Sequence, residues 1–140
     1  MIQIAVLVLN PFEYLPLKQD LEANQKVVRI LEKSKGPVWV PYHSYLTRRA
    51  GKPPHAHILA LVDVKQGDKD GSSLPVEQQM QKLVSGRVFS IVILDQVDRF
   101  SIGRAFLQND YKIKGALFDH QWGYPVSGYK TRPFHVLVPR

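Results

Sequence analysis

The stretch RVFSIVILD, residues Arg87 to Asp95, decides the fold that this sequence predicts. It is a run of β-branched and aromatic residues without regular polar alternation, which is typical of a central parallel strand covered on both faces. Its last residue, Asp95, falls where open α/β sheets bind ligands. We therefore expect an α/β domain with this strand near the centre of its sheet.

Helices are predicted on the N-terminal side of this strand. Residues 16–35 repeat their leucines and valines at spacings built from three and four, and the pattern ends at Gly36-Pro37, as an amphipathic helix does. A second helix is predicted from Leu74-Pro75 to Gly86. Residues 42–49 are expected to form a short helix or a turn.

Four further strands complete the predicted sheet: Val38–Val40, His57–Val64, Tyr111–Phe118 and Phe134–Val138. The segment His57–Val64, HILALVDV, is ambiguous between a strand and a buried helix, and its length favours a strand with Leu59, Leu61 and Val62 in the core. Strands and helices then alternate along most of the chain. This order predicts a three-layer α/β/α Rossmann-like domain with a mostly parallel sheet of about five strands.

The chain is expected to form one soluble domain over residues 16–140, preceded by an apolar segment over residues 1–15. Residues 1–9, MIQIAVLVL, are too few to span a bilayer, which takes about twenty residues, and they lack the features of a signal peptide. Two interpretations remain: a first buried strand, or the last turns of a transmembrane helix. The β-branched run that ends at Asn10-Pro11 favours the strand.

Composition excludes several kinds of chemistry. The 140 residues include no cysteine, so disulfides, thiolate zinc sites and cysteine nucleophiles are ruled out. The net charge of +7 favours acidic partners, but the basic residues are spread along the chain. We expect a mildly basic face and no nucleic-acid partner.

Polar groups are densest between Val40 and Val64, where three of the five histidines lie. His55 and His57 fall on one side of an extended segment, and His43 and Asp63 are candidates to complete a metal shell. Exposed or hydrogen-bonded histidines account for the same pattern and are favoured, so we predict no metal site.

The same stretch contains Arg48, Arg49 and Lys52, which are candidates to hold an anion such as a phosphate. A nucleotide phosphate loop is not expected, because the first glycine of that motif is absent and Pro53 replaces its hydroxyl residue. A solvated basic loop is the simpler alternative.

Hydrolase chemistry is not favoured. Ser44 lies beside His43, but the chain has no G-x-S-x-G elbow to present a nucleophile. Carboxylates at or near strand ends, Asp63, Asp95 and Asp119, are candidates for acid–base work, and capping or ion pairing explains them more simply.

The aromatic and glycine-rich segment that follows Asp119 is the last candidate. Trp122 and Tyr124, with the nearby Arg132, suit the stacking of a sugar or base, and packing against another domain or a membrane interface is favoured over it. The candidate ligand-binding residues are therefore His43, Arg48, Arg49, Lys52, His55, His57, Asp63, Trp122, Tyr124 and Arg132.

Several short motifs, taken in order, resemble a known family. They are Asn10-Pro11, Leu15-Pro16 with Asp20, VPYHSYL (40–46), AGKPPHAH (50–57), LVDV (61–64), FSIVILD (89–95), Tyr111 and PVSGYKTRPFHVLVP (125–139). Their order resembles the soluble C-terminal region of bacterial multi-spanning membrane glycosyltransferases of the GT-C type, which are related to dolichyl-phosphate-mannose protein mannosyltransferases. The resemblance covers nearly the whole chain.

The resemblance implies membrane-linked sugar transfer from a polyprenyl-phosphate donor, with this domain on the extracytoplasmic, periplasmic face of the inner membrane. It also implies that residues 1–9 are the end of a transmembrane helix, which reverses the preference for a strand. Enzymes of this type carry their catalytic carboxylate between early transmembrane helices, which this sequence does not contain. The expected role is therefore that of an accessory domain without catalytic residues or a cofactor of its own.

The partners implied are the membrane-embedded glycosyltransferase region and a polyprenyl-phosphate sugar donor or its acceptor. A free-standing α/β protein that binds a metal or a small anionic ligand is the alternative function.

Overall fold

The computed structural model describes residues 15, 17–71, 73–95, 107, 109–118 and 132–140. Its elements, in chain order, are α2 (Lys18–Glu32), β1 (Val38–Trp39), α3 (Ser44–Arg49), α4 (Ile58–Gly67), α5 (Leu74–Ser85), β2 (Ile91–Asp95), β3 (Tyr111–Ala116) and β4 (Pro133–Pro139). Residues 1–9 and the aromatic segment 119–131 lie outside the described residues. The predicted helices at 16–35, 42–49 and 74–86 are confirmed, as are the strands predicted around 38–40, 87–95, 111–118 and 134–138.

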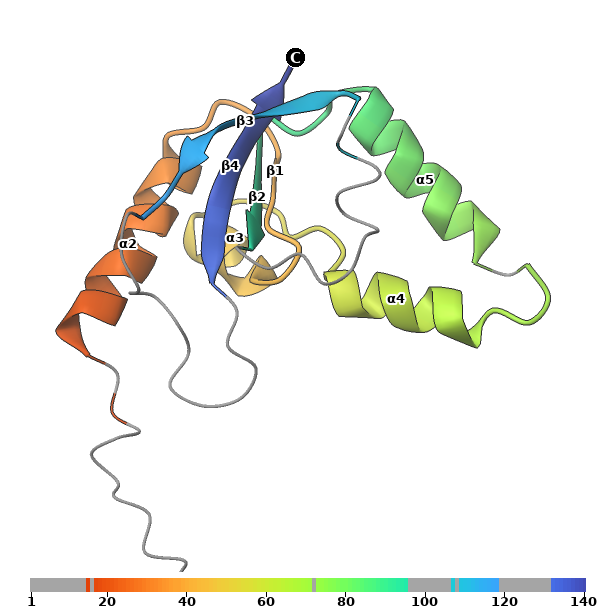
Figure 1. Ribbon diagram of the computed structural model, residues 1–140, viewed down its shortest axis with the longest axis horizontal. Coiled ribbons are helices and arrows are strands. Elements are labelled where there is room, and N and C mark those ends of the chain that lie inside the picture. Colours follow the sequence, from red (N-terminus) through yellow and green to blue (C-terminus); the bar gives the residue numbers. More distant parts are fainter. Residues whose placement is uncertain (1–14, 16, 72, 96–106, 108, 119–131) are drawn as a thin grey trace, which may run out of the picture.

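In the described residues the sheet has four strands, in the order β1-β2-β4-β3 (Figure 1). Among these strands only β1 and β2 are parallel, with Val38 opposite Ile91. The strand β4 runs antiparallel to β2 on one side and to β3 on the other. The prediction of a three-layer Rossmann-like domain with a mostly parallel sheet of about five strands is therefore wrong.

Part of the error comes from residues 58–64, which lie in the helix α4 and not in a strand, and the rest comes from the direction of β4, which is antiparallel to both of its neighbours. Parallel neighbours need a crossover connection of a dozen or more residues, usually helical. The described elements provide one such crossover, from β1 through α3, α4 and α5 to β2. The remaining described strand pairs are antiparallel.

One face of the sheet packs on α2 and α3. Val27 and Leu31 of α2 pack with Leu46 of α3 on Val38 and Ile93 of the sheet. These side chains are fully buried, and the helical spacing of Val27 and Leu31 matches the apolar stripe predicted from the sequence. This face is one of the two cores of the domain.

The other face packs on α5. Trp39, Val92 and Leu94 alternate with the residues of the first face along β1 and β2, and they meet Met80 and Val84 of α5. The period of two along each strand separates the two cores. β2 contributes to both, which confirms that the stretch RVFSIVILD contains a central strand.

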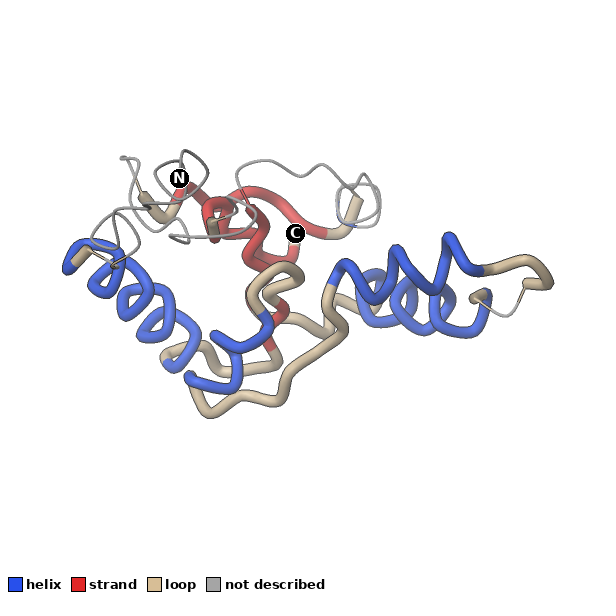
Figure 2. The backbone as a smooth tube through the Cα atoms, turned by 90° about the horizontal axis from the view of Figure 1, so that it is seen from below, coloured by secondary structure: helices blue, strands red, loops and turns tan. Residues whose placement is uncertain are grey.

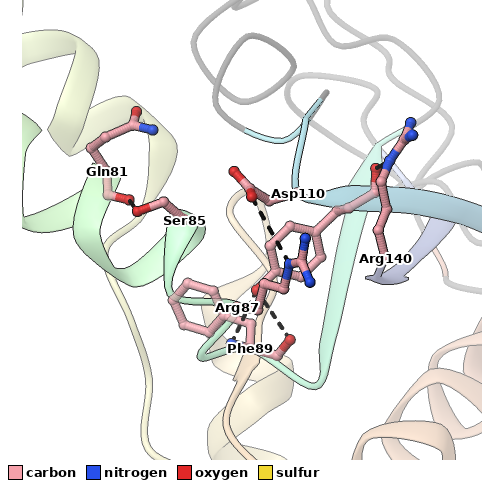
Figure 3. Close-up of polar contacts among 7 residues, drawn as sticks. Gln81, Ser85, Arg87, Phe89, Asp110 and Arg140 are labelled. Atoms are coloured by element: carbon pink, nitrogen blue, oxygen red, sulfur yellow. Dashed lines mark hydrogen bonds and ion pairs between the residues drawn. The ribbon is translucent and has the colours of Figure 1, made fainter.

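Tyr111, the first residue of β3, is hydrogen-bonded to the segment that precedes β2. The hydroxyl of Tyr111 donates to the carbonyl of Phe89 and accepts from its N–H, both at 3.1 Å (Figure 3). Arg87 and Asp110 add an ion pair at 3.9 Å on the same side. Phe89 in turn stacks on Trp39, with their ring centroids 5.6 Å apart.

The helices α4 and α5 form a hairpin that extends away from the sheet (Figures 1 and 2). Leu61 and Val64 of α4 face Val76 and Met80 of α5 across it. Lys65 and Glu77 form an ion pair at 3.5 Å between the two helices.

Candidate functional site at the carboxyl end of the parallel strands

The two parallel strands end at the same edge of the sheet. The chain leaves β1 and reaches His43 within four residues of Trp39, and β2 ends at Asp95. The antiparallel β4 begins at this edge, because Pro133 is paired with Asp95 and Arg132 precedes it. Ligands of open α/β sheets bind at this edge, so we consider it the candidate site.

His43 and Asp95 form a hydrogen-bonded pair. Nε2 of the imidazole lies 3.1 Å from Oδ2 of the carboxylate, and the side chains are 12% and 0% exposed. The carboxylate only accepts, so Nε2 carries the proton and the other ring nitrogen, Nδ1, is left as an acceptor in the neutral ring. Asp95 thus fixes the orientation of a histidine at the surface.

The second oxygen of Asp95 differs from the first in its contacts. Its Oδ1 atom is buried and makes no hydrogen bond among the described residues. A buried acceptor without a partner costs about 1–3 kcal/mol, more when it is charged, so such atoms mark places where a ligand or water is bound. The carboxylate therefore has one oxygen bonded to His43 and one buried oxygen that makes no hydrogen bond among the described residues.

Tyr45 and Arg49 of α3 extend the pair toward solvent. The ring of Tyr45 meets the His43 ring edge-on, with centroids 6.1 Å apart, and is 51% exposed. Partial desolvation raises the pKa of Tyr45, with Asp95 adding to the increase and Arg49 opposing it. The phenol therefore remains a hydrogen-bond donor at neutral pH, beside an exposed guanidinium.

Arg132 is buried at the same edge. It is 5% exposed, and its guanidinium carbon lies 5.0 Å from the centroid of the Phe134 ring. A guanidinium stacks well on aromatic faces and so tolerates burial. We call the five residues His43, Tyr45, Arg49, Asp95 and Arg132 the carboxyl-end site.

Two other sequence candidates, Lys52 and His57, make hydrogen bonds that stabilise the local backbone. Lys52 donates from Nζ to the carbonyl of Ser34 at 2.6 Å, which ties its loop to the end of α2. The Nδ1 atom of His57 accepts from the N–H of Leu59 at 3.2 Å and caps α4, while Nε2 lies 3.0 Å from the carbonyl of Tyr42. The tautomer with its proton on Nε2 satisfies both contacts of His57.

His55 lies on the other side of the sheet. Its ring meets Phe89 edge-on at 4.8 Å between centroids, and its Nε2 atom is buried without a hydrogen-bond partner among the described residues. Desolvation lowers the pKa of His55 below its ordinary value of 6.5. This histidine is a packing residue of the α5 face.

The remaining candidates are not brought together. Arg48 and Asp63 are exposed on α3 and α4, and Trp122 and Tyr124 lie outside the described residues. No group of three histidines, aspartates or glutamates with metal-binding geometry occurs in the described part of the chain. The alternative metal shell of His43, His55, His57 and Asp63 is not formed. His43 is hydrogen-bonded to Asp95, while His55 packs on Phe89 and His57 caps α4.

The sequence identified His43, Arg49 and Arg132 as candidates and noted Asp95 as a carboxylate at a strand end. It did not pair His43 with Asp95, and it missed Tyr45. The signal that links them is positional: His43 follows one parallel strand and Asp95 ends the next.

Comparison with protein-family models, with curated proteins and with solved structures finds no match to this chain. Among the described residues, no helix has the length and apolar character needed to cross a bilayer.

Proposed function

We propose that this chain is an extracytoplasmic accessory domain of a polyprenyl-phosphate-sugar-dependent membrane glycosyltransferase. It has no catalytic role of its own, and it contacts the sugar phosphate at the carboxyl-end site. The proposal rests on the motif resemblance and on the geometry of this site.

The observation that carries the proposal is the convergence of three resembling motifs. His43 belongs to VPYHSYL, Asp95 to FSIVILD and Arg132 to the closing motif that starts at Pro125. These motifs are far apart in the sequence, yet the sheet brings all three to one edge.

The chemistry of the site suits a sugar phosphate. Sugar hydroxyls both donate and accept, and the exposed phenol of Tyr45 offers them a hydrogen-bond donor at this edge. Arg49 is exposed beside them and supplies the planar donor set that phosphate oxygens prefer. Asp95 holds the imidazole of His43 in one orientation for the same ligand.

The first test is a binding titration followed by amide NMR, with mannose 1-phosphate and glucose 1-phosphate as soluble probes. We expect saturable shifts in the amides of residues 43–49 and 95. Inorganic phosphate and free mannose should bind more weakly, because each lacks half of the recognised chemistry. The absence of saturable shifts with both sugar phosphates would overturn the proposal.

Variants assign the binding to the site. Arg49→Ala should weaken sugar-phosphate binding about tenfold, or ~1.4 kcal/mol, by removing the phosphate contact. Arg29→Ala removes an equal charge from the exposed side of α2, away from the site, and should leave the affinity unchanged. Equal losses from both variants would mean that the probe responds only to net charge.

A further inference from the structure

A concave surface lies between α2 and the sheet. It is a groove of about 330 Å³. The residues that line it are Lys26, Ile30, Ile91, Lys114, Gly115, Ala116, Leu117, Val136 and Val138. None of them belongs to the carboxyl-end site.

The groove exists because α2 and α3 cover only part of their face of the sheet. Their buried side chains pack on β1 and on Ile93 of β2. Farther across the sheet, Ile91, Val136 and Val138 are only half-buried. Pockets for small ligands are mostly apolar with a few polar groups, and their volumes begin near 300 Å³.

Two lysines flank this apolar floor. Lys26 comes from α2, and its Nζ donates to the carbonyl of Leu117 at 2.7 Å and lies 5.3 Å from the Phe118 ring centroid. Lys114 comes from the irregular part of β3, where the register shifts between Ile113 and Gly115. Both lysines are exposed, and the ammonium of Lys26 has fixed partners.

No acidic residue lines the groove, and in the described part of the chain neither Lys26 nor Lys114 pairs with a carboxylate. The groove therefore combines an apolar floor with two uncompensated positive charges. A monoester of phosphate carries about −1.5 to −2 charges at neutral pH, which matches two lysines. Lysine binds such groups as a point charge.

We propose that the groove binds one single-chain lipid phosphate, with the hydrocarbon chain on Ile30, Ile91, Val136 and Val138 and the phosphate at Lys26 and Lys114. This inference goes beyond the sugar-phosphate proposal and shares no residue with it. Loss of either site leaves the other testable.

Gly115 makes the groove easy to block. A Cβ atom built on this residue meets no other atom within 4 Å, and its backbone does not require glycine. Gly115→Val therefore adds a β-branched side chain that a strand accepts, and it narrows the groove without a clash at its Cβ atom. This variant reduces the volume of the groove and leaves its two lysines unchanged.

The experiment is calorimetric and NMR titration of the full chain with monomeric dodecyl phosphate. We expect saturable binding with amide shifts at residues 114–117 and 136–138. Dodecyltrimethylammonium, which has the same chain and the opposite charge, and inorganic phosphate, which has no chain, should bind at least about tenfold more weakly, or ~1.4 kcal/mol. Equal binding of the cationic amphiphile would overturn the proposal.

Two charge-matched variants complete the test. Lys114→Glu should weaken dodecyl phosphate binding about tenfold or more, while Lys82→Glu, at an exposed position on α5, which packs on the other face of the sheet, should not. Gly115→Val should abolish the shifts at residues 136–138 in a folded protein. Binding that survives both Lys114→Glu and Gly115→Val, or that Lys82→Glu weakens equally, would contradict the inference.

Discussion

The imidazole of His55 is placed where protonation is costly. Its Nε2 atom is buried without a partner among the described residues, and the ring edge rests on the face of Phe89. The neighbouring carbonyl of Ala56 is already bonded to Nε1 of Trp39 at 2.9 Å. The position therefore favours the neutral ring, and desolvation lowers the pKa of His55.

Acidification should lower the free energy of unfolding through His55. In the unfolded chain His55 protonates near its ordinary pKa of 6.5, while the folded protein resists protonation until a lower pH. Between these two pKa values the unfolded state therefore binds more protons than the folded state. The contribution of His55 to the stability of the folded protein is complete above about pH 6.5 and is lost as the pH falls through the folded pKa. Denaturant unfolding at about pH 7 and about pH 5 measures this loss.

His55→Leu supplies the comparison. It removes the titrating group and keeps apolar contact with Phe89, so the free energy of unfolding should fall less on acidification than in the parent chain. The difference between the two pH slopes isolates His55 from the carboxylates, which titrate in both proteins. Parallel slopes would show that burial of this imidazole does not couple to folding.

The sequence predicted the carboxyl-end site only in part, because it does not show which partner each histidine side chain contacts. A histidine in a polar stretch is consistent with a metal ligand, a cap or a catalytic base, and the sequence shows no partner. His43, His55 and His57 look alike in sequence, yet one bonds a carboxylate, one packs on a ring and one caps a helix. Their partners lie 52, 34 and 2 residues away, so only the fold distinguishes them.

At the scale of elements, α4 is where pattern and structure disagree most. The sequence does not show the helical period of α4, because exposed positions of this helix are apolar as well as buried ones. Leu59 is 47% exposed and Val64 is 44% exposed, while Ile58 and Val62 are buried. The buried pair is spaced by four residues, as on one face of a helix. Exposed apolar residues made the segment look like a uniformly buried strand.

A substitution at Ala60 distinguishes the two conformations. In a strand, Ala60 shares a face with Ile58 and Val62, whereas in α4 it is exposed. Ala60→Glu should therefore change the free energy of unfolding by less than about 0.5 kcal/mol. Ile58→Ala should lower it by roughly 2–5 kcal/mol, because it opens a cavity at a fully buried position.

Denaturant unfolding of both variants provides the measurement. If Ala60→Glu destabilised the protein as strongly as Ile58→Ala, the segment would have to be extended in solution. Far-UV circular dichroism of the folded variants serves as the control, since neither change should lower the helix content.

At the scale of the whole molecule, the sequence predicted the class of elements better than their arrangement. The apolar pattern of a strand states that both of its faces are covered, as for Val92, Ile93 and Leu94, but not in which direction its neighbour runs. Here β2 has a parallel neighbour on one side and an antiparallel neighbour on the other. Direction follows from the connections, and one misassigned segment changes the inferred order of the sheet.

The central strand nevertheless makes the molecule cooperative, because its residues point alternately into both cores. Ile93 joins the core under α2, and Val92 and Leu94 join the core under α5. A side chain lost from either core therefore weakens the sheet that both share. We expect the two faces to unfold together, as small single domains usually do.

Leu31→Ala and Met80→Ala test this coupling from opposite faces. Leu31 is fully buried and Met80 nearly so, and each substitution should lower the free energy of unfolding by roughly 2–5 kcal/mol. Leu21→Ala, at a site on α2 that is 50% exposed, is the control and should have an effect within about 0.5 kcal/mol. Tryptophan fluorescence includes Trp39 on the α5 face, and far-UV circular dichroism follows all elements. If Leu31→Ala shifted the dichroism transition and left the fluorescence transition in place, the two faces would unfold independently, and β2 would not be the element that unites the fold.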